Sequence, residues 1–365
     1  MKTLSILLLA AAAALCSCHR SNEQTALNGR PYVFRQYSDG RPQATKRMTA
    51  HDTGVVLRHG DGPDSCDWYG AREAIAFEDS GIYYMHYDGA GPTGWLACLA
   101  TSTDFVHWTR SGPALRLGTP ESPDAKSASA PWVIREGDTW HMFYLGTPHT
   151  SPPPDRIPSF PYLTLKARAR SPRGPWEKQY DVVPFAPTDS TYYTITASPG
   201  FIVKSGGGYL QFFSASIFDE HHNTMRTLGI ARTNDLNGRW SPDPAPIVPL
   251  AEQIENSSLY FEPSNGTWFL FTNHIGIDDH GGEYADAIWV YWSKDLNTWN
   301  TRDKAIVLDG QNCTWAHGAV GMPSVVAAGR KLALLYDGCP GESTSHMGRD
   351  IGLAWLDLPL EPVSD

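Results

Sequence analysis

Two glutamates stand at the starts of first strands in a segment that recurs along the chain. The first strands of the recurring unit start with Arg72-Glu73-Ala74-Ile75 and Glu255-Asn256-Ser257-Ser258, and the three other units have no carboxylate there. Cleavage of a glycosidic bond needs two carboxyl groups beside it, one protonated to assist the leaving oxygen and one ionised. We therefore expect Glu255 and Glu73 to form a catalytic pair, with Asp67 as the alternative to Glu73.

Each glutamate also has a simpler structural explanation. Glu255 could cap backbone amides in its loop, and Glu73 could form an ion pair with Arg72. Asp286 starts a strand close to Glu255, where it would raise the pKa of Glu255 by like-charge proximity or bind a sugar hydroxyl. The simpler alternative for Asp286 is a turn residue.

Other polar and aromatic residues fall in loops that we expect at the same end of the fold. Arg349 could hold a sugar carboxylate through two hydrogen bonds, although an ordinary salt bridge is the simpler account. His317 could also donate a proton, because histidine titrates near neutrality. The remaining candidates for substrate contact are Arg72, Asp67, Asp88, His274, Asp337 and Asp350, with Trp68, Trp95 and Trp315 as rings for stacking on sugars.

The segment that carries these residues is a strand, a Gly- or Asn-containing turn and an aromatic-rich strand. It occurs five times, at 75–87, 133–144, 201–213, 259–271 and 325–336. Hairpins repeated at intervals of roughly 60 residues are typical of radially repeated β-sheets. The pattern predicts an all-β fold, a five-bladed β-propeller.

A third strand follows several of these hairpins, at 95–102, 226–233, 287–293 and 350–357. After three of the units an Asp, a hydrophobic residue and a Trp mark a turn into a fourth, outer strand. The last unit ends after its third strand, so we expect the segment 54–57 to supply its outer strand. This N-terminal strand would close the ring and remove exposed sheet edges.

The N-terminal 18 residues have the features of an export signal. Lys2 precedes the apolar run 4–15, and Leu15-Cys16-Ser17-Cys18 resembles a bacterial lipobox, after which Cys18 would be lipidated. An ordinary cleaved signal peptide is the alternative. We expect 1–18 to be a signal peptide, 19–30 a tether and 31–365 a single catalytic domain, in a periplasmic or cell-surface lipoprotein held to the membrane by its lipid alone.

Composition excludes some partners. The formal net charge of −10 disfavours nucleic acid, whose phosphates would be repelled. Motifs of phosphate loops, GxSxG hydrolases, HExxH metalloenzymes and dinucleotide binding are absent from the sequence, so no cofactor and no metal site is expected. We expect a monomer, and among the four later cysteines a Cys313–Cys339 bridge.

The pattern resembles the five-bladed propeller glycosidases grouped around glycoside hydrolase families 43, 62, 32, 117 and 130. The segment 129–144 (SAPWVIREGDTWHMFY) is similar to a family-43 signature, and the start at Glu255 resembles that family's acid-bearing motif. The resemblance implies that Glu255 is the general acid. In that family a blade-5 histidine is linked to a calcium ion, but here Met322 stands at that place, which disfavours a central calcium because sulfur is a poor ligand for a hard cation.

These features together predict an exo-acting glycoside hydrolase that removes terminal sugars from plant or algal oligosaccharides. An inverting mechanism follows if Glu255 and Glu73 lie on opposing sides of the axis. Two alternatives stay open. One is a surface glycan-binding lipoprotein without catalysis, and the other is a glycoside phosphorylase, which needs a cluster of Arg, Lys and His to hold phosphate.

Overall fold

The computed structural model describes residues 32–37, 40–277 and 282–364, and the fold is all-β. The chain divides into two units, 1–33 and 34–365, and every strand belongs to the second. Among the described residues the only helices are two 3-10 turns, Pro63–Ser65 and Leu250–Glu252, and neither is long or apolar enough to cross a membrane. The predicted signal peptide with Cys18 and the tether at 19–30 lie outside the described residues.

The strands come in runs of four that pair antiparallel in chain order, except that the last run takes its fourth strand from the N-terminal side of the chain. The first two runs are β2 (Gly70–Asp79), β3 (Ile82–Gly91), β4 (Gly94–Ser102) and β5 (Thr109–Pro113), then β6 (Ser127–Glu136), β7 (Thr139–Thr147), β8 (Leu163–Ala169) and β9 (Glu177–Lys178). The next two are β10 (Thr196–Ser205), β11 (Gly208–Phe218), β12 (Thr224–Thr233) and β13 (Ser241–Pro242), then β14 (Ile254–Glu262), β15 (Thr267–Ile277), β16 (Glu283–Ser293) and β17 (Lys304–Asp309). The last is β18 (Val320–Ala328), β19 (Lys331–Gly338), β20 (Asp350–Asp357) and β1 (His51–Leu57).

All five predicted hairpins are confirmed as antiparallel pairs of a first and a second strand. The expected pairing of the N-terminal strand is also confirmed, because β1 pairs with β20 through Val55 opposite Gly352 and Leu57 opposite Ile351. A short parallel ladder between β4 and β6 joins the first two runs into one hydrogen-bonded sheet.

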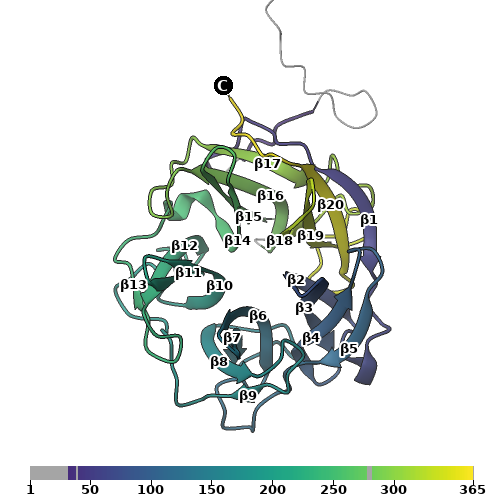
Figure 1. Cartoon of the computed structure of the whole chain (residues 1–365), viewed down its shortest axis with the longest axis vertical. Helices are drawn as coiled ribbons and strands as arrows, with labels where there is room; N and C mark the ends of the chain where they lie inside the picture. The colour runs from purple at the N-terminus through teal and green to yellow at the C-terminus, as the bar shows by residue number, and fades with distance from the viewer. Residues whose placement is uncertain (1–31, 38–39, 278–281, 365) are drawn as a thin grey trace, which may run out of the picture. The chain divides into compact units, whose positions relative to one another are not determined.

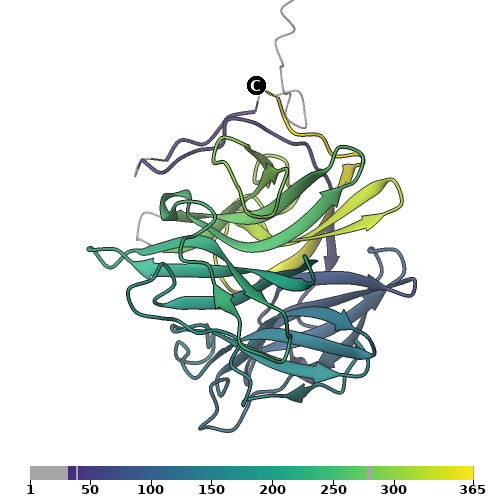
Figure 2. The same cartoon turned by 60° about the vertical axis from the view of Figure 1, so that its left-hand side comes forward.

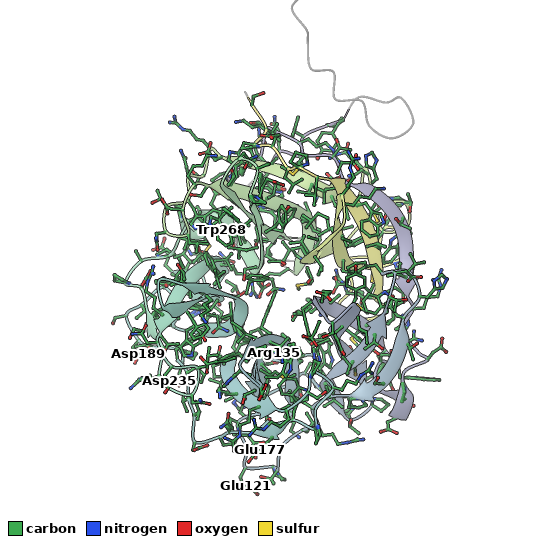
Figure 3. All side chains as sticks on the ribbon, viewed as in Figure 1. Glu121, Arg135, Glu177, Asp189, Asp235 and Trp268 are labelled. Atoms are coloured by element: carbon green, nitrogen blue, oxygen red, sulfur yellow. The ribbon has the colours of Figure 1, made fainter. Side chains whose placement is uncertain are left out.

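Within residues 34–365 the runs lie around a common centre. Figure 1 shows the first strands β2, β6, β10, β14 and β18 nearest that centre, and the fourth strands at the periphery. The turned view in Figure 2 shows the long strands of each run stacked side by side. Charged residues at the outer edge, such as Glu121 and Glu177, are exposed (Figure 3). Because the first strands lie nearest the centre, the loops that precede them meet at one end of it.

The turns into the outer strands are built by the Asp-hydrophobic-Trp pattern. Asp295 accepts the backbone N–H groups of Asn297 and Thr298 at 2.7 Å, and the Trp299 ring N–H donates to the carbonyl of Leu296 at 3.1 Å. Leu296 and Trp299 are both buried. The aspartate satisfies amides that the turn leaves unpaired, while the two apolar side chains fix the turn to the core.

The expected Cys313–Cys339 bridge is wrong. All four described cysteines, Cys66, Cys98, Cys313 and Cys339, are buried free thiols. The Cys313 sulfur lies 3.4 Å from the hydroxyl of Tyr336, whereas the Cys339 thiol donates to the carbonyls of Ser345 and Met347. The two sulfurs therefore have different partners, although both loops lie at the same end of the last run.

Asp52 is the residue that fastens β1 to its neighbours. It accepts hydrogen bonds from Tyr336 Oη at 2.5 Å, from the N–H of Gly54 at 3.0 Å and from Thr314 N and Oγ1 at 2.7 and 2.5 Å. We expect Asp52→Ala to lower the free energy of unfolding by about 2–4 kcal/mol, because the buried Tyr336 hydroxyl loses its charged acceptor. Urea unfolding with the exposed Asp138→Ala as control measures this, and equal values for the two variants would contradict it.

Candidate active site

Every first strand bulges at the same place. The pairing with the second strand shifts between Arg72 and Ile75, and the other four first strands shift between 129 and 132, 198 and 201, 255 and 258, and 321 and 324. Four non-glycine residues in these bulges have positive φ, namely Glu73 (47°), Ala130 (44°), Asn256 (59°) and Met322 (58°). Such a conformation costs roughly 1–2 kcal/mol per residue and persists only where surrounding contacts enforce it.

The bulge amides are held by side chains from the second strand of the neighbouring run. Asp337 of β19 accepts the N–H of Glu73 at 2.9 Å, Asp88 of β3 accepts that of Ala130 at 2.5 Å, and Ser214 of β11 accepts that of Asn256 at 2.9 Å. All three acceptors are buried. Because a buried unpaired N–H is costly, these acceptors fix both the bulge and the neighbouring run.

The bulges surround one pocket at the centre of residues 34–365. It contains about 630 Å³ of space, including the part open to solvent, and the five first strands contribute Glu73, Ala130, Pro199, Asn256 with Glu255, and Met322 to its wall. Arg72, Asp88, Trp95, Tyr162, Arg226 and His346 complete the polar and aromatic lining. The predicted pair Glu73 and Glu255 thus shares one pocket.

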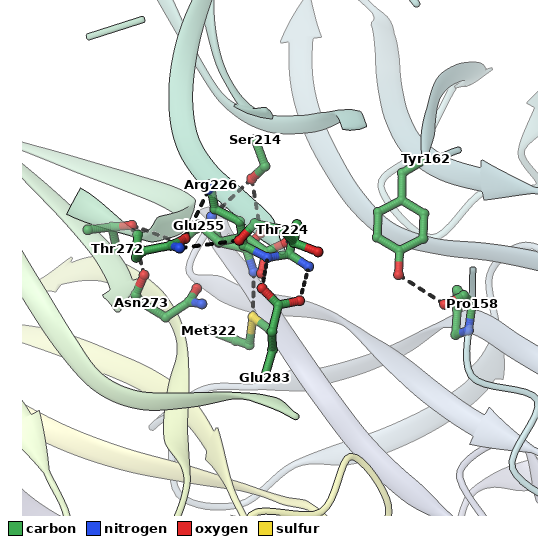
Figure 4. A network of polar contacts seen from close by, with 12 residues as sticks. Pro158, Tyr162, Ser214, Thr224, Arg226, Glu255, Thr272, Asn273, Glu283 and Met322 are labelled. Atoms are coloured by element: carbon green, nitrogen blue, oxygen red, sulfur yellow. Dashed lines mark hydrogen bonds and ion pairs between the residues drawn. The ribbon is translucent and has the colours of Figure 1, made fainter. Parts of the chain in front are cut away.

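Glu255 is bound to an arginine. Arg226 NH1 donates to Glu255 Oε1 at 2.7 Å, while Nε and NH2 of the same guanidinium bind both oxygens of Glu283 at 3.0 and 2.8 Å (Figure 4). The second oxygen of Glu255 accepts no hydrogen bond from the described residues. Burial raises the pKa of Glu255 and the Glu283 charge adds to this effect, but Arg226 opposes both.

Glu73 has a different environment. Its carboxyl group forms no hydrogen bond and no ion pair with any residue that the structure describes, although its backbone is clasped by Asp337. Burial raises the pKa of Glu73 well above its usual value, and the charges of Asp88, Glu255 and Asp337 raise it further against the opposing effect of Arg72. At neutral pH this favours a protonated Glu73 facing an arginine-bound Glu255.

Arg72 and His346 lie next to each other in the pocket wall, and only Arg72 carries a positive charge. Arg72 NH1 lies 3.2 Å from Nδ1 of His346, and its guanidinium lies 4.9 Å from the centre of the Trp95 ring. Burial lowers the pKa of His346 to about 3, and the nearby arginines lower it in the same direction. The imidazole is therefore neutral and can accept the hydrogen bond from Arg72.

Asp286 and His274 lie away from this pocket. Asp286 Oδ1 lies 2.7 Å from Nδ1 of His274, and its Oδ2 accepts hydrogen bonds from Tyr37 Oη at 2.9 Å and Arg35 NH1 at 3.0 Å. His274 is fully buried and stacks on Trp289 with ring centres 4.0 Å apart. The N-terminal segment therefore occupies both residues, and Asp286 is not among the groups that act on the pKa of Glu255. His317 lines this second pocket together with Asp286.

Four other expected substrate contacts also lie outside the pocket. Asp67 is fully buried and accepts the amide of Gly62 and the hydroxyl of Tyr87, so it holds its loop. Arg349 is buried and donates to Asp337 at 2.5 Å, which agrees with the simpler salt-bridge account. Asp350 accepts from His59 and Arg58, and Trp68 is 56% exposed on the surface.

Two of the expected aspartates hold bulge amides, and only one of them lines the pocket. Asp88 lines the pocket but also clasps Ala130, and Asp337 lies behind Glu73 without lining the pocket. Trp95 lines the pocket, whereas the Trp315 ring N–H donates to Tyr336 Oη at 2.7 Å.

Arg226, Glu283, Tyr162 and His346 were not expected from sequence. Their only signal was their position in or beside the long loops at this end.

The pocket does not suit the calcium ion that the family resemblance implies. Met322 offers a thioether where a histidine would stand, and no group of three or more His, Cys, Asp or Glu side chains arranged to hold a metal occurs among the described residues. Hard cations require oxygen ligands in larger number. We therefore derive no chemical step through a metal.

Comparison with known proteins gives matches at the level of structure. No protein-family model and no curated protein matches the sequence. Among solved structures, one described as a glycoside hydrolase has 14% identity and a TM-score of 0.66, covering 86% of this chain and 93% of its own. The catalytic domain of a Coprinopsis cinerea family-62 α-L-arabinofuranosidase has 11% identity and a TM-score of 0.59, with coverages of 84% and 96%.

A third match is a family-117 glycoside hydrolase of the marine bacterium Zobellia galactanivorans, with 15% identity, a TM-score of 0.57 and coverages of 84% and 90%. A thermostable family-43 glycoside hydrolase is also similar. The chain therefore shares its fold with the propeller glycoside hydrolases of families 43, 62 and 117. At these identities the likeness establishes the fold, and the chemistry must be argued from the pocket.

The environment of Asp88 leads to a test by unfolding. Burial raises the pKa of Asp88 from 3.8 to about 7, against the Ala130 amide and Arg72, which lower it. The protonated form is therefore favoured by folding, and its contribution to stability is present below pH 4 and lost as pH rises through 7. We expect Asp88→Asn to gain on the order of 2–4 kcal/mol relative to wild type between pH 4 and pH 8. Urea unfolding at both pH values, with Asp138→Asn as control, measures this, and a constant difference would contradict it.

Proposed function

We propose that this protein is a five-bladed β-propeller glycoside hydrolase that removes terminal sugars from oligosaccharides. The likeness to propeller glycoside hydrolases supports the class. The five runs of strands and the pairing of β1 with β20 support five blades with a ring closed by the N-terminal strand. The observation that carries the activity is the presence of Glu73 and Glu255 in one pocket, where only Glu255 is hydrogen-bonded to an arginine.

The two carboxyl groups divide the work. Glu73, which lacks a cationic hydrogen-bond partner among the described residues and has a raised pKa, acts as the acid that protonates the leaving oxygen. Glu255, held by Arg226 at 2.7 Å, acts as the ionised group in the pocket wall. This assignment reverses the roles that the family resemblance implies. The reason is that Arg226 binds Glu255, whereas the Glu73 carboxyl group has no cationic hydrogen-bond partner among the described residues.

The spacing of the strands favours inversion. Glu73 belongs to β2 and Glu255 to β14, and β18 lies between them in contact with both. Inversion requires a water molecule between the sugar and the second carboxylate, and Glu255 activates this water as a base. The two bond changes follow in one step: the water oxygen bonds to the anomeric carbon and yields a proton to Glu255, while the glycosidic bond breaks and its oxygen takes the proton of Glu73.

A pocket with a single set of bulges around it suits the end of a chain better than its middle, which supports exo action. For the substrate we propose terminal sugars of plant or algal oligosaccharides. Two similar structures are described as α-L-arabinofuranosidases and one as an exo-1,5-α-L-arabinanase from a bovine ruminal source. Arabinofuranosides are therefore the first substrates to test.

Two alternatives are weaker. A phosphorylase needs guanidinium groups ready to hold phosphate, but the donors of Arg226 are engaged by Glu255 and Glu283, and His346 is neutral. A glycan-binding lipoprotein without catalysis is favoured by one observation, the Arg226–Glu255 pair. Glu73 argues against it, because a buried carboxyl group with a raised pKa and no hydrogen-bond partner among the described residues is typical of catalytic pockets.

We further propose that residues 31–365 act as one monomeric catalytic domain, and that Cys18 anchors the protein to a bacterial membrane facing the periplasm or the exterior. The lipobox-like Leu15-Cys16-Ser17-Cys18 supports this. Fractionation of cells that express wild type or Cys18→Ala tests the anchor: wild type should stay with membranes, and the variant should become soluble.

The division of roles predicts different leaving-group dependence for two variants. The substrates are a native oligosaccharide and the dinitrophenyl glycoside of its terminal sugar. Glu73→Gln should lower kcat/KM by about 10²–10⁴-fold for the oligosaccharide. The loss should be far smaller for the dinitrophenyl glycoside, because dinitrophenolate leaves without being protonated. Glu255→Gln should lose activity on both. The exposed Glu121→Gln serves as control.

The reverse result, with Glu255→Gln alone sensitive to the leaving group, would return the role of acid to Glu255. Undiminished cleavage by both variants would reject the two-carboxylate proposal. Proton NMR of the first-formed sugar tests the stereochemistry, since retention of the anomeric configuration would contradict inversion.

The pH profile gives an independent check. Activity should fall at low pH as Glu255 gains a proton, and fall at high pH as Glu73 loses one, with the alkaline limb displaced upward by the raised pKa of Glu73. In Glu73→Gln the alkaline limb should disappear while the acidic limb remains. A profile of kcat/KM measured from pH 4 to pH 9 shows whether it does.

A further inference from the structure

A row of four aromatic rings leads from the pocket to the surface. The ring centres of Tyr162 and Phe160 lie 4.7 Å apart, those of Phe160 and Phe218 lie 5.9 Å apart at 79°, and those of Phe218 and His222 lie 6.2 Å apart. We name these residues, Tyr162, Phe160, Phe218 and His222, the aromatic row. They come from two separate segments, the loop before β8 and the end of β11 with the connection that follows it.

The inner end of the row belongs to the candidate active site. Tyr162 lines the pocket that holds Glu73 and Glu255. The guanidinium carbon of Arg226 lies 5.8 Å from the centre of the Phe160 ring, and the same arginine binds Glu255 at 2.7 Å. The row is therefore continuous with the site through both a pocket residue and the partner of a catalytic carboxylate.

The outer end of the row is open to solvent. Phe218 is 44% exposed, although it ends a strand whose other aromatic residues are buried. What distinguishes Phe218 from the other exposed apolar side chains is its contact with Phe160, whose ring centre lies 5.9 Å away. Phe218 lies two rings beyond Tyr162 of the pocket wall, on the path that the later units of a chain would take if the terminal unit filled the pocket.

Hydrogen bonds hold both segments in place. Tyr162 Oη donates to the carbonyl of Pro158 at 2.9 Å, and Ser151 and Ile157 exchange backbone and side-chain hydrogen bonds across the loop. In the β11–β12 connection, Asp219 accepts the N–H groups of His221 and Asn223 at 2.8 Å. Rings held this way lose little freedom when a ligand stacks on them, so stacking contributes more fully to affinity.

We propose that the aromatic row binds the sugar rings that follow the terminal residue of an oligosaccharide, by stacking their C–H faces on Phe160 and Phe218. The proposal rests on the proposed function, because it assigns the leaving-group side of the same site. Aromatic faces suit this ligand, since sugar rings offer apolar C–H faces and the ring quadrupole attracts their positive edges. The substrate class is then a chain of at least two or three sugars, and a small glycoside is used less well.

The experiment compares Phe218→Ala with a matched control. Phe261 is also an exposed phenylalanine, 41% exposed and paired with Trp268, but it lies near the hairpin at the far end of β14 from Glu255. Arabino-, xylo- and agaro-oligosaccharides of two to five units are the probes, together with the 4-nitrophenyl glycosides of their terminal sugars. Both kcat/KM and binding by calorimetry are measured on the full exported protein.

Wild type should gain in kcat/KM from two to three or four units on the oligosaccharide series that it cleaves. Phe218→Ala should lose about three- to tenfold on the longer members and leave the 4-nitrophenyl glycoside unchanged. Phe261→Ala should match wild type throughout, and Phe218→Tyr should restore the gain. His222→Ala, at the exposed end, should show a smaller loss on four and five units only.

The possible failures are distinguishable. If wild type cleaves the glycosides but Phe218→Ala and Phe261→Ala behave alike on every chain length, the aromatic row is not a binding surface and the proposed function stands. If wild type cleaves nothing but binds oligosaccharides with an affinity that Phe218→Ala lowers, the row stands and the hydrolytic function falls. Binding and cleavage that are both independent of Phe218 overturn the inference.

Discussion

The structure depends on one constraint, the need to satisfy the backbone N–H groups that the bulged first strands turn away from their own ladders. Asp337, Asp88 and Ser214 meet this need for Glu73, Ala130 and Asn256. Each acceptor belongs to the second strand of the neighbouring run, so the hydrogen bond that relieves the bulge also joins two runs. The four bulge residues with positive φ all line the central pocket.

This constraint also decides where charge collects. Two of the three acceptors are aspartates, buried because an N–H group must be reached there, and both raise the pKa of the Glu73 carboxyl whose strand they support. Arg226 arrives from a different element and binds Glu255 together with Glu283. Identical side chains at equivalent bulges thus obtain different protonation preferences, because one has carboxylates behind it and the other has a guanidinium beside it.

The sequence predicted the scaffold well because hairpins, turns and aromatic strands repeat, and repetition is visible without coordinates. It located Glu73 and Glu255 for the same reason, since both stand at an aligned strand start. It predicted substrate contact for Asp88 and Asp337 but not their role as acceptors of bulge amides, because the need of a bulge for an acceptor on another run has no local signal. It missed Arg226 and His346, whose partners lie 29 and 274 residues away in the chain. Asp286 and His274 look like site residues in the sequence, yet Arg35 and Tyr37 occupy them.

The bulge also explains how one scaffold can hold different chemistries. Four of the five bulges hold a non-glycine residue with positive φ, and Glu, Ala, Asn and Met all occupy that position here. The side chain is therefore free to change while the backbone geometry stays the same. Similar structures at 11–15% identity can then share strand order without sharing any one catalytic group. What identifies the chemistry of a given chain is the set of residues around the bulges, which here means Arg226 and Glu283 beside Glu255, and Asp88 and Asp337 beside Glu73. These residues decide which of the two glutamates keeps its proton, and the fold alone does not.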